Sequence, residues 1–275
     1  MLFNQNKYLL PLLLLVNIIL PMAAAENSAL ALLDREIIFS LNFDDGTLYP
    51  EMSLGEVEPA NVSGNPIFVA GRFGQALLLG GENGVRVHYR AWKNIDFSMP
   101  GAMSFWLAPE QWLQPGEVDE RPYLRFFHLQ GTGAGYIFMQ RQGFVNKTRT
   151  DGSISKRGDM FQVGYYSFSK WKNRLLGAYN TINWPKDEWR FFVVNWDRNS
   201  ASLSINGKTC AQIQFARPIV NEDFPKPENP KFNFVIGNGT SQETTKLDEL
   251  IIYRRNLAPE EIGQIYQETI VTEHK

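Results

Sequence analysis

The sequence predicts an all-β fold, a sandwich of two antiparallel sheets in jelly-roll order with one short C-terminal helix. Segments in which apolar and polar residues alternate recur along the chain, and glycine, proline, asparagine and aspartate separate them. Apolar residues at helical spacing form a convincing pattern only near the C-terminus. About a dozen short strands and one helix favour a sandwich over a helical or an alternating α/β fold.

The two ends of the predicted domain carry its clearest elements. Residues 36–43 alternate as a strand, and its inward residues are Ile37, Phe39, Leu41 and Phe43. Residues 250–253 are apolar on both sides, as in a buried strand. A helix is predicted from Pro259, because proline's missing N–H costs nothing at a first helical position. Glu260 and Glu261 follow in the first turn, where the helix dipole favours negative charge.

Between these ends, the alternating pattern predicts a series of strands separated by turns. They are expected over residues 71–81, 84–89, 101–112, 124–129, 135–140, 160–168, 189–197, 201–209 and 232–237. Asn206 and Gly207 have the residue types of a two-residue hairpin turn. Residues 50–66 and 221–231 are rich in proline and are expected to be loops, and residues 146–157 are expected to be an exposed hairpin loop.

Several of these segments resemble the LamG-like jelly-roll family, which is part of the concanavalin A-like group. The similar segments are LDELIIYRRNLAPEEI at 247–262, GRFGQALLLGG at 71–81, WRFFVVNWD at 189–197, and residues 101–112 and 201–209. The sequence departs from the family where Gly80 and Gly81 replace a common acidic position, and Glu82 follows two residues later. The resemblance implies one LamG-like domain over residues 36–270. Residues 113–185 match the family least and are expected to carry this protein's specificity.

Composition limits the classes of partner. The chain has 275 residues, of which 44% are hydrophobic and 20% charged, and its formal net charge is −2. A near-neutral chain gives no electrostatic reason to expect a nucleic acid partner. Cys210 is the only cysteine, which excludes an intramolecular disulfide. We expect a monomer.

The N-terminus has the pattern of a secretory signal peptide. Lys7 precedes an apolar run over residues 8–20, and three alanines end at Ala25. We therefore predict a signal peptide over residues 1–25, with a secreted, periplasmic or extracellular mature protein that is not attached to a membrane. The alternative is an uncleaved anchor, but the run is shorter than the roughly 20 residues that span a bilayer.

Four acidic residues suggest a structural calcium site. Asp44 and Asp45 end the first predicted strand, and Asp248 and Glu249 begin the last. Terminal strands of a sandwich often pair, which would bring these carboxylates together, and calcium prefers such hard oxygen ligands. The family resemblance implies the same site, completed by backbone carbonyls. Asp44 and Asp248 are the first candidates. The alternative is that Asp44 and Asp45 shape a turn and Asp248 caps a loop.

Aromatic residues are frequent within residues 113–185, and sugar C–H faces stack on such rings while polar neighbours orient the hydroxyls. Trp171 lies between two lysines, and of the adjacent Tyr165 and Tyr166 one must point away from the core. The predicted ligand-contacting residues are Tyr166, Trp171, Trp184, Tyr136, His128 and Arg125. The alternative is that these rings belong to the core, as most aromatic residues of a sandwich do.

Catalysis is a further alternative, because the resemblance implies a fold that glycosidases and polysaccharide lyases also use. Residues 117–120 are the nearest match to a paired-carboxylate motif, but their spacing is wrong. His128 with Arg125, Tyr136 and Tyr166 would be a lyase-like group. A histidine in an apolar strand is more often a core residue.

The sequence therefore predicts a secreted, non-catalytic module that binds a glycan or glycoprotein on its concave sheet. The alternatives are a protein-interaction or surface-structural module and a lyase or glycosidase.

Overall fold

The computed structural model describes residues 33–271, apart from residues 83, 114–122, 131–134, 143–144, 149–153, 158–159, 168–173, 180–183, 216–217, 219–228, 230–231 and 238–240. The chain divides into two compact units, residues 1–35 and 36–275. The predicted signal peptide lies outside the described residues. All the strands that the structure describes belong to the second unit.

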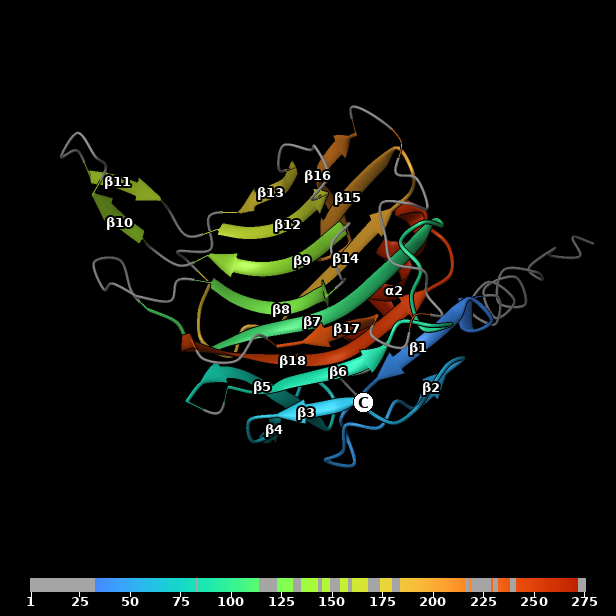
Figure 1. Ribbon diagram of the computed structural model, residues 1–275, viewed down its shortest axis with the longest axis horizontal. Coiled ribbons are helices and arrows are strands. Elements are labelled where there is room, and N and C mark those ends of the chain that lie inside the picture. Colours follow the sequence, from blue (N-terminus) through green and yellow to red (C-terminus); the bar gives the residue numbers. More distant parts are fainter. Residues whose placement is uncertain are drawn as a thin grey trace, which may run out of the picture. The chain divides into compact units, whose positions relative to one another are not determined.

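The second unit is a sandwich of two antiparallel sheets, as predicted (Figure 1). One sheet has nine strands, with β16-β15-β14-β7-β18-β1-β2 in order, β5 paired to β18 and β4 paired to β5. Its strands are β1 (Ile37–Leu41), β2 (Met52–Ser53), β4 (Phe68–Ala70), β5 (Gln75–Gly81), β7 (Gly101–Gln111), β14 (Arg190–Trp196), β15 (Ser200–Ile205), β16 (Lys208–Gln214) and β18 (Ser241–Tyr253).

The other sheet has seven strands in the order β13-β12-β9-β8-β17-β6-β3. Its strands are β3 (Asn61–Ser63), β6 (Arg86–Arg90), β8 (Tyr123–Gln130), β9 (Gly135–Gln142), β12 (Met160–Ser167), β13 (Arg174–Tyr179) and β17 (Asn233–Ile236). β10 (Val145–Thr148) and β11 (Ile154–Arg157) form a separate hairpin, as predicted for this part of the chain.

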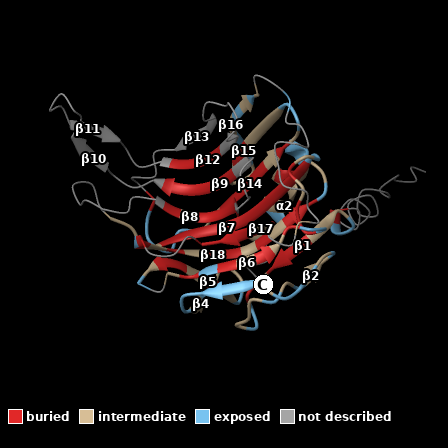
Figure 2. Cartoon of the chain, in the orientation of Figure 1, coloured by how far each residue is buried: buried red, intermediate tan, exposed pale blue. Residues whose placement is uncertain are grey.

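The first and last strands lie side by side. Phe39 of β1 is opposite Ile252 of β18, and Leu41 is opposite Leu250. All four side chains belong to the apolar core between the sheets. Met103, Phe105 and Leu107 of β7 belong to the same core. Figure 2 shows the resulting band of buried strands in red, with β3 exposed at one edge.

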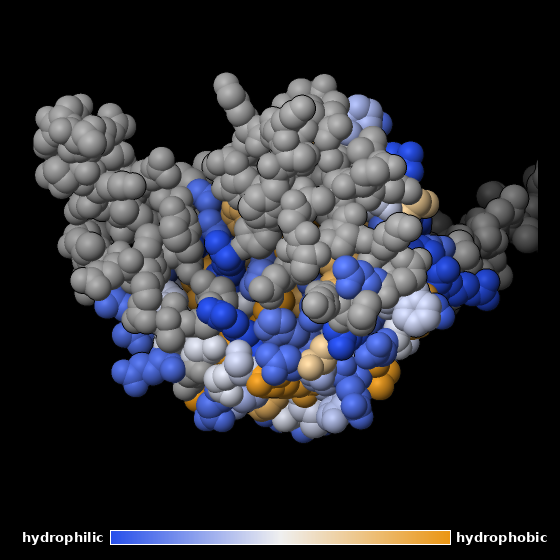
Figure 3. Space-filling model, viewed as in Figure 1, coloured by the Kyte–Doolittle hydropathy of each residue, from blue (hydrophilic) through white to orange (hydrophobic). Residues whose placement is uncertain are grey.

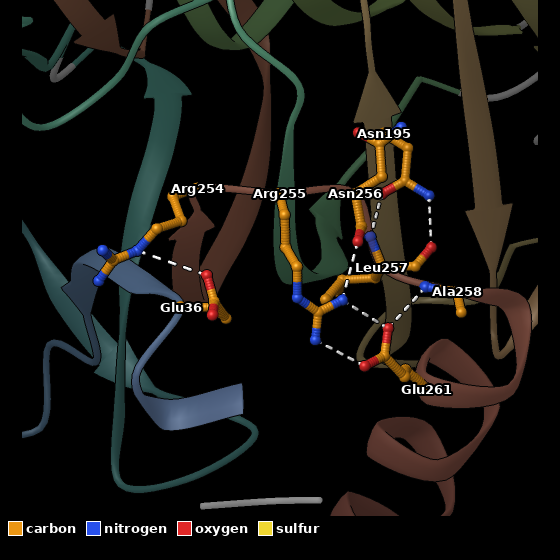
Figure 4. Close-up of polar contacts among 8 residues, drawn as sticks. All are labelled: Glu36, Asn195, Arg254, Arg255, Asn256, Leu257, Ala258 and Glu261. Atoms are coloured by element: carbon orange, nitrogen blue, oxygen red, sulfur yellow. Dashed lines mark hydrogen bonds and ion pairs between the residues drawn. The ribbon is translucent and has the colours of Figure 1, made fainter. Parts of the chain in front are cut away.

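The C-terminal helix α2 (Pro259–Val271) begins at the predicted residue. Glu261 accepts a hydrogen bond from Ala258 N at 2.7 Å, which satisfies a backbone donor at the helix start, and it also pairs with Arg255 (Figure 4). Asn195 of β14 ties the preceding turn through two hydrogen bonds to the Leu257 backbone. These contacts fix α2 against the nine-stranded sheet.

Helix α2 covers part of the outer face of the nine-stranded sheet. Tyr266 stacks on Trp106 of β7 and on Phe191 of β14, with ring centroids 6.1 and 6.3 Å apart. Ile262 is buried beside them in the same helix. No helix among the described residues combines the length and the apolar character that crossing a bilayer requires.

The structure corrects two sequence-based boundaries. Residues 50–66 were expected to be a loop but contain the short strands β2 and β3. β18 begins at Ser241, well before the apolar residues that predicted it, because its buried positions there are polar: Ser241, Glu243 and Thr245. Glu243 forms a buried ion pair with Arg141 of β9, which links the two sheets.

Candidate functional site

The outer face of the seven-stranded sheet carries polar and cationic residues. A row of mutually opposite residues crosses six strands: Asn61, His88, Val235, His128, Phe138 and Gly164. The strand neighbours of this row, such as Val87, Leu129 and Met139, belong to the core. Because side chains alternate along a strand, the row lies on the outer face. The sequence predicted binding on the concave sheet by residues that include His128 of this row.

The half of this face over β8, β9 and β12 is closed. Arg125 Nε donates to Gln140 Oε1 at 3.2 Å, and Gln140 Nε2 donates to Gln162 Oε1 at 2.9 Å. Both glutamines are buried, and so is Phe138. A Cβ on Gly164 would lie 2.0 Å from the Phe138 ring, so this ring requires a glycine on the neighbouring strand. These side chains bond and pack among themselves.

His128 lies within the closed half and is buried. Burial is the main cause that lowers its pKa to about 3, and the positive charges of Arg125 and Arg86 and the neighbouring His88 add to it. The imidazole is therefore neutral at physiological pH and is a weak base.

The half of the face over β6 is open. Arg86 is exposed, and His88 and Arg90 are partly exposed. Ala91 is a core residue whose N–H continues the ladder by donating to Phe232 O, and the exposed Trp92 follows in the turn after β6. We call Arg86, His88, Arg90 and Trp92 the β6 row. Figure 3 shows hydrophilic residues in blue gathered over this strand.

Trp92 is the exposed ring of the β6 row, with 45% of its surface accessible. The Lys93 ammonium lies 4.7 Å from the ring centroid. Glu56 forms an ion pair with Arg90, with 3.7 Å between the carboxylate oxygen and Arg90 Nε. The end of β6 therefore combines an indole, two cations and one acid.

Asn94 holds this end of β6 in place. Its side chain is fully buried and makes four hydrogen bonds. Oδ1 accepts from Ser53 Oγ and Gly55 N, both at 2.8 Å. Nδ2 donates to Glu56 O at 3.1 Å and to Arg90 O at 3.2 Å. All the hydrogen-bonding capacity of the amide is thus used, which ties residues 53–56 to the turn that carries Trp92.

Some residues predicted to contact a ligand have side chains that the structure does not describe, whereas Trp184 is described and buried. Tyr136 and Tyr166 are opposite each other in the β9–β12 register, but their side chains lie outside the description, as does all of Trp171. Trp184 is buried, stacks on Phe192, and donates from Nε1 to Glu188 O at 2.5 Å. It has no exposed ring face for a sugar, so the structure corrects this prediction.

Arg125 and His128 do share the outer face, but both belong to its closed half. The prediction missed Trp92, because it sought rings only within residues 113–185. The sequence signal that could have indicated Trp92 was the alternation of Arg86, His88 and Arg90 with apolar residues. Trp92 lies in the turn that follows them.

The predicted calcium ligands fall into two groups. Asp248 is fully buried, and its Oδ2 accepts from Arg72 N at 2.8 Å and from Phe73 N at 3.0 Å. Its Oδ1 accepts from Glu249 N at 2.9 Å. Burial is the main cause that raises the pKa of Asp248 to about 8. Asp248 therefore caps the loop of the GRFG segment, which was the alternative to metal binding.

Asp44 also holds this loop, since its Oδ1 accepts from Gln75 N at 3.0 Å. A Cβ on Gly74 would lie 2.0 Å from that oxygen, and Gly74 has a φ of +43°, so the loop requires glycine there. Asp45 bonds only within its own turn, to Thr47.

The charge of Asp44 acts on Glu249. Burial first, and then the charges of Asp44 and Glu51, raise the pKa of Glu249 to about 7. In the part of the chain that the structure describes, no group of three or more histidine, cysteine, aspartate or glutamate side chains is placed to hold a metal ion.

Residues 79–263 match the profile of the concanavalin A-like lectin/glucanase superfamily. The chain belongs to this superfamily. A search of curated proteins found no match.

Three solved structures illustrate the shared fold. The receptor-binding domain of botulinum neurotoxin mosaic serotype C/D has a TM-score of 0.59 and 15% identity, over 87% of this chain and 52% of that chain. The binding domain of botulinum neurotoxin DC in complex with SialylT has a TM-score of 0.56 and 16% identity, over 86% of this chain and 52% of that chain. Domain 4 of AbnA, a GH43 extracellular arabinanase from Geobacillus stearothermophilus, was solved with arabinotriose. It has a TM-score of 0.52 and 19% identity, over 84% of this chain and 100% of that chain. The chain thus spans about half of each toxin domain.

Proposed function

We propose that this chain is a non-catalytic carbohydrate-binding module that holds a saccharide on the outer face of its seven-stranded sheet, at the β6 row. The observation that carries the proposal is the row itself, in which an exposed indole follows three outward nitrogen-bearing side chains on one strand. The superfamily supports it, as do the complexes of two structural neighbours with arabinotriose and with SialylT.

The chemistry of the row suits a sugar. An indole offers an apolar face for sugar C–H groups, while arginine and histidine nitrogens hydrogen-bond to hydroxyl oxygens. His88 has a lowered pKa, caused first by burial and then by the Arg86 charge. A neutral imidazole can both donate and accept, as a hydroxyl requires.

Binding without catalysis is supported by His128. A lyase needs a base that removes a proton near neutral pH, and a buried imidazole with a pKa of about 3 is poorly matched to that task. Arg125, the proposed partner in such a mechanism, is bonded to Gln140. Incubation with the bound polysaccharide should therefore release no shorter or unsaturated products, and product formation that His128→Gln abolishes would contradict this.

The binding test is a glycan array followed by titration calorimetry with the best saccharide. We expect Trp92→Ala to reduce affinity at least tenfold, whereas Tyr49→Ala, which removes another exposed ring, should leave it unchanged. An array without any bound glycan, or equal effects of the two substitutions, would overturn the proposal.

A protein partner is the second candidate, because Leu54 and Val57 are exposed in the segment that Asn94 holds beside Trp92. Combined substitution of Leu54 and Val57 by serine distinguishes the two functions. Saccharide affinity should survive these changes, whereas a protein contact at the apolar patch would be lost.

We propose that residues 1–25 are removed as a signal peptide, which places the monomeric mature domain outside the cytoplasm. N-terminal sequencing of the mature protein tests this directly. A first residue at or near Glu26 is expected, and retention of Met1 in the exported protein would contradict it.

We also propose that a calcium ion is held by Asp44 and Glu249 with backbone carbonyls and water. The support is the repulsion between the exposed Asp44 and the partly buried Glu249, which a cation would relieve. Calcium should raise the thermal midpoint of the wild type and of the exposed control Glu58→Gln, but not of Glu249→Gln. An unchanged wild-type midpoint with calcium and with chelator would remove the site.

A further inference from the structure

The open half of the outer face has an excess of positive charge over a whole strand and the turn that follows it. Arg86, Arg90 and Lys93 are cations. Glu56 forms an ion pair with Arg90, and Asn233 Oδ1 accepts from Arg90 Nη1 at 3.2 Å. Arg86 is exposed, and its charge reaches both His88 and His128. The chain as a whole carries a formal net charge of −2, so this local excess is not a reflection of general basicity.

The cations are spread out along β6. Alternate residues of a strand are roughly 7 Å apart, so Arg86 lies about 13 Å from Arg90, and Trp92 follows in the turn after β6. A single anionic sugar cannot contact all three positions. A linear chain with anionic groups on successive sugars can.

We infer that the ligand is a linear acidic oligosaccharide, whose carboxylate or sulfate groups lie on Arg86 and Arg90 while one of its sugar rings stacks on Trp92. This inference rests on the proposed function and names the class of saccharide for that site. Arginine suits either anion, because its planar fork of N–H donors matches two oxygens of a carboxylate or a sulfate.

Trp92 is held ready for such a ligand. The four hydrogen bonds of Asn94 fix the turn before any ligand arrives, so binding loses little conformational entropy there. Lys93 lies against the ring and adds a cation at the point where the sugar stacks. Asn94 is a positioning residue in this arrangement, since its side chain is buried and cannot contact the saccharide.

The matched substitutions are Arg86→Gln and Arg198→Gln. Both remove an exposed arginine charge, but Arg198 lies in the turn between β14 and β15 and donates to Ser98 O. Titration calorimetry would use three oligosaccharides of equal length: a linear oligouronate, a sulfated oligomer and a neutral cello-oligosaccharide. A uronate disaccharide gives the dependence on length, and unfolding curves confirm that each variant is folded.

We expect the longer oligouronate or the sulfated oligomer to bind at least tenfold more tightly than the neutral chain and than the disaccharide. Arg86→Gln should weaken this binding about fivefold, and Arg198→Gln should leave it unchanged. Higher salt should weaken the acidic ligands alone. Stronger binding of the uronate than of the sulfated oligomer identifies the carboxylate as the anion, and the reverse order identifies the sulfate.

Two results would overturn the inference and leave the proposed function standing. One is neutral and acidic chains that bind equally, with no effect of Arg86→Gln. The other is equal weakening by Arg86→Gln and Arg198→Gln, which would mean attraction by general charge. If a broad neutral and acidic glycan array shows no binding at all, the proposed function itself fails.

Discussion

The two outer faces of the sandwich differ in what their side chains contact. On the nine-stranded sheet, Trp106 is buried beneath Tyr266 of helix α2. On the seven-stranded sheet, Trp92 is exposed at the end of the β6 row. Tryptophan is therefore a buried packing residue on one face and a solvent-exposed residue on the other. The comparison teaches that a tryptophan's role here depends on which face it occupies and on what covers that face.

Substituting these two tryptophans should produce the largest contrast. Trp106→Ala removes a buried ring and should lower the free energy of unfolding by about 3–5 kcal/mol. Trp92→Ala removes an exposed ring and should change it by less than about 0.5 kcal/mol. Denaturant unfolding of both variants measures this. Comparable losses of stability would mean that Trp92 is a packing residue after all.

Asn94 should matter to both stability and binding. Asn94→Ala leaves buried partners of its amide unsatisfied and should cost up to about 3 kcal/mol of unfolding free energy. It should also weaken saccharide binding, because the turn that carries Trp92 loses its support. Titration of the folded variant well below its melting temperature separates the two effects. Full affinity in Asn94→Ala would contradict its positioning role.

The buried His128 should make the free energy of unfolding depend on pH. Its pKa is about 3 in the folded protein and about 6.5 when unfolded, so the unfolded state binds the proton first as the pH falls. The folded protein should therefore lose about 2 kcal/mol of stability relative to His128→Gln between pH 7 and pH 5. Unfolding curves of both proteins at these pH values measure the difference. Parallel pH profiles would show that His128 becomes protonated without unfolding.

Removal of the helix cap on the covered face should have a smaller effect. Glu261→Ala loses the hydrogen bond from Ala258 N and the ion pair with Arg255, and should cost about 1 kcal/mol. The Arg255 partner is the main cause that lowers the pKa of Glu261, so the loss should persist down to mildly acidic pH. Saccharide affinity should not change, because α2 lies on the other sheet. Reduced affinity would couple the two faces.

Most of the fold followed from alternation and from the ends of the chain. Phe39 and Leu41 alternate with less buried residues, and Pro259 with Glu261 marks a helix start by local chemistry alone. The beginning of β18 was not predictable in this way, because Glu243 is buried and pairs with Arg141, which lies 102 residues earlier in the chain, while also accepting from Leu113 N. Hydrophobic patterns do not reveal such a distant partner.

The candidate site was less predictable than the fold. The sequence named Arg125 and His128, which do lie on one outer face, but it did not show that their half of that face is closed. It also paired Asp248 with Asp44 as ion ligands, whereas a bulge at Glu249, with a φ of +49°, leaves Asp248 capping the GRFG loop. Both differences depend on backbone geometry that residue types alone do not specify.

The central claim is that a saccharide binds on the outer face of the seven-stranded sheet at its β6 edge. Backbone amide chemical shifts in NMR spectra, recorded while the tightest-binding oligosaccharide is added, test it most directly. The account predicts that the shifted amides cluster within residues 86–94 and their neighbours in β3 and β17. Shifts confined to α2 and the nine-stranded sheet would contradict it.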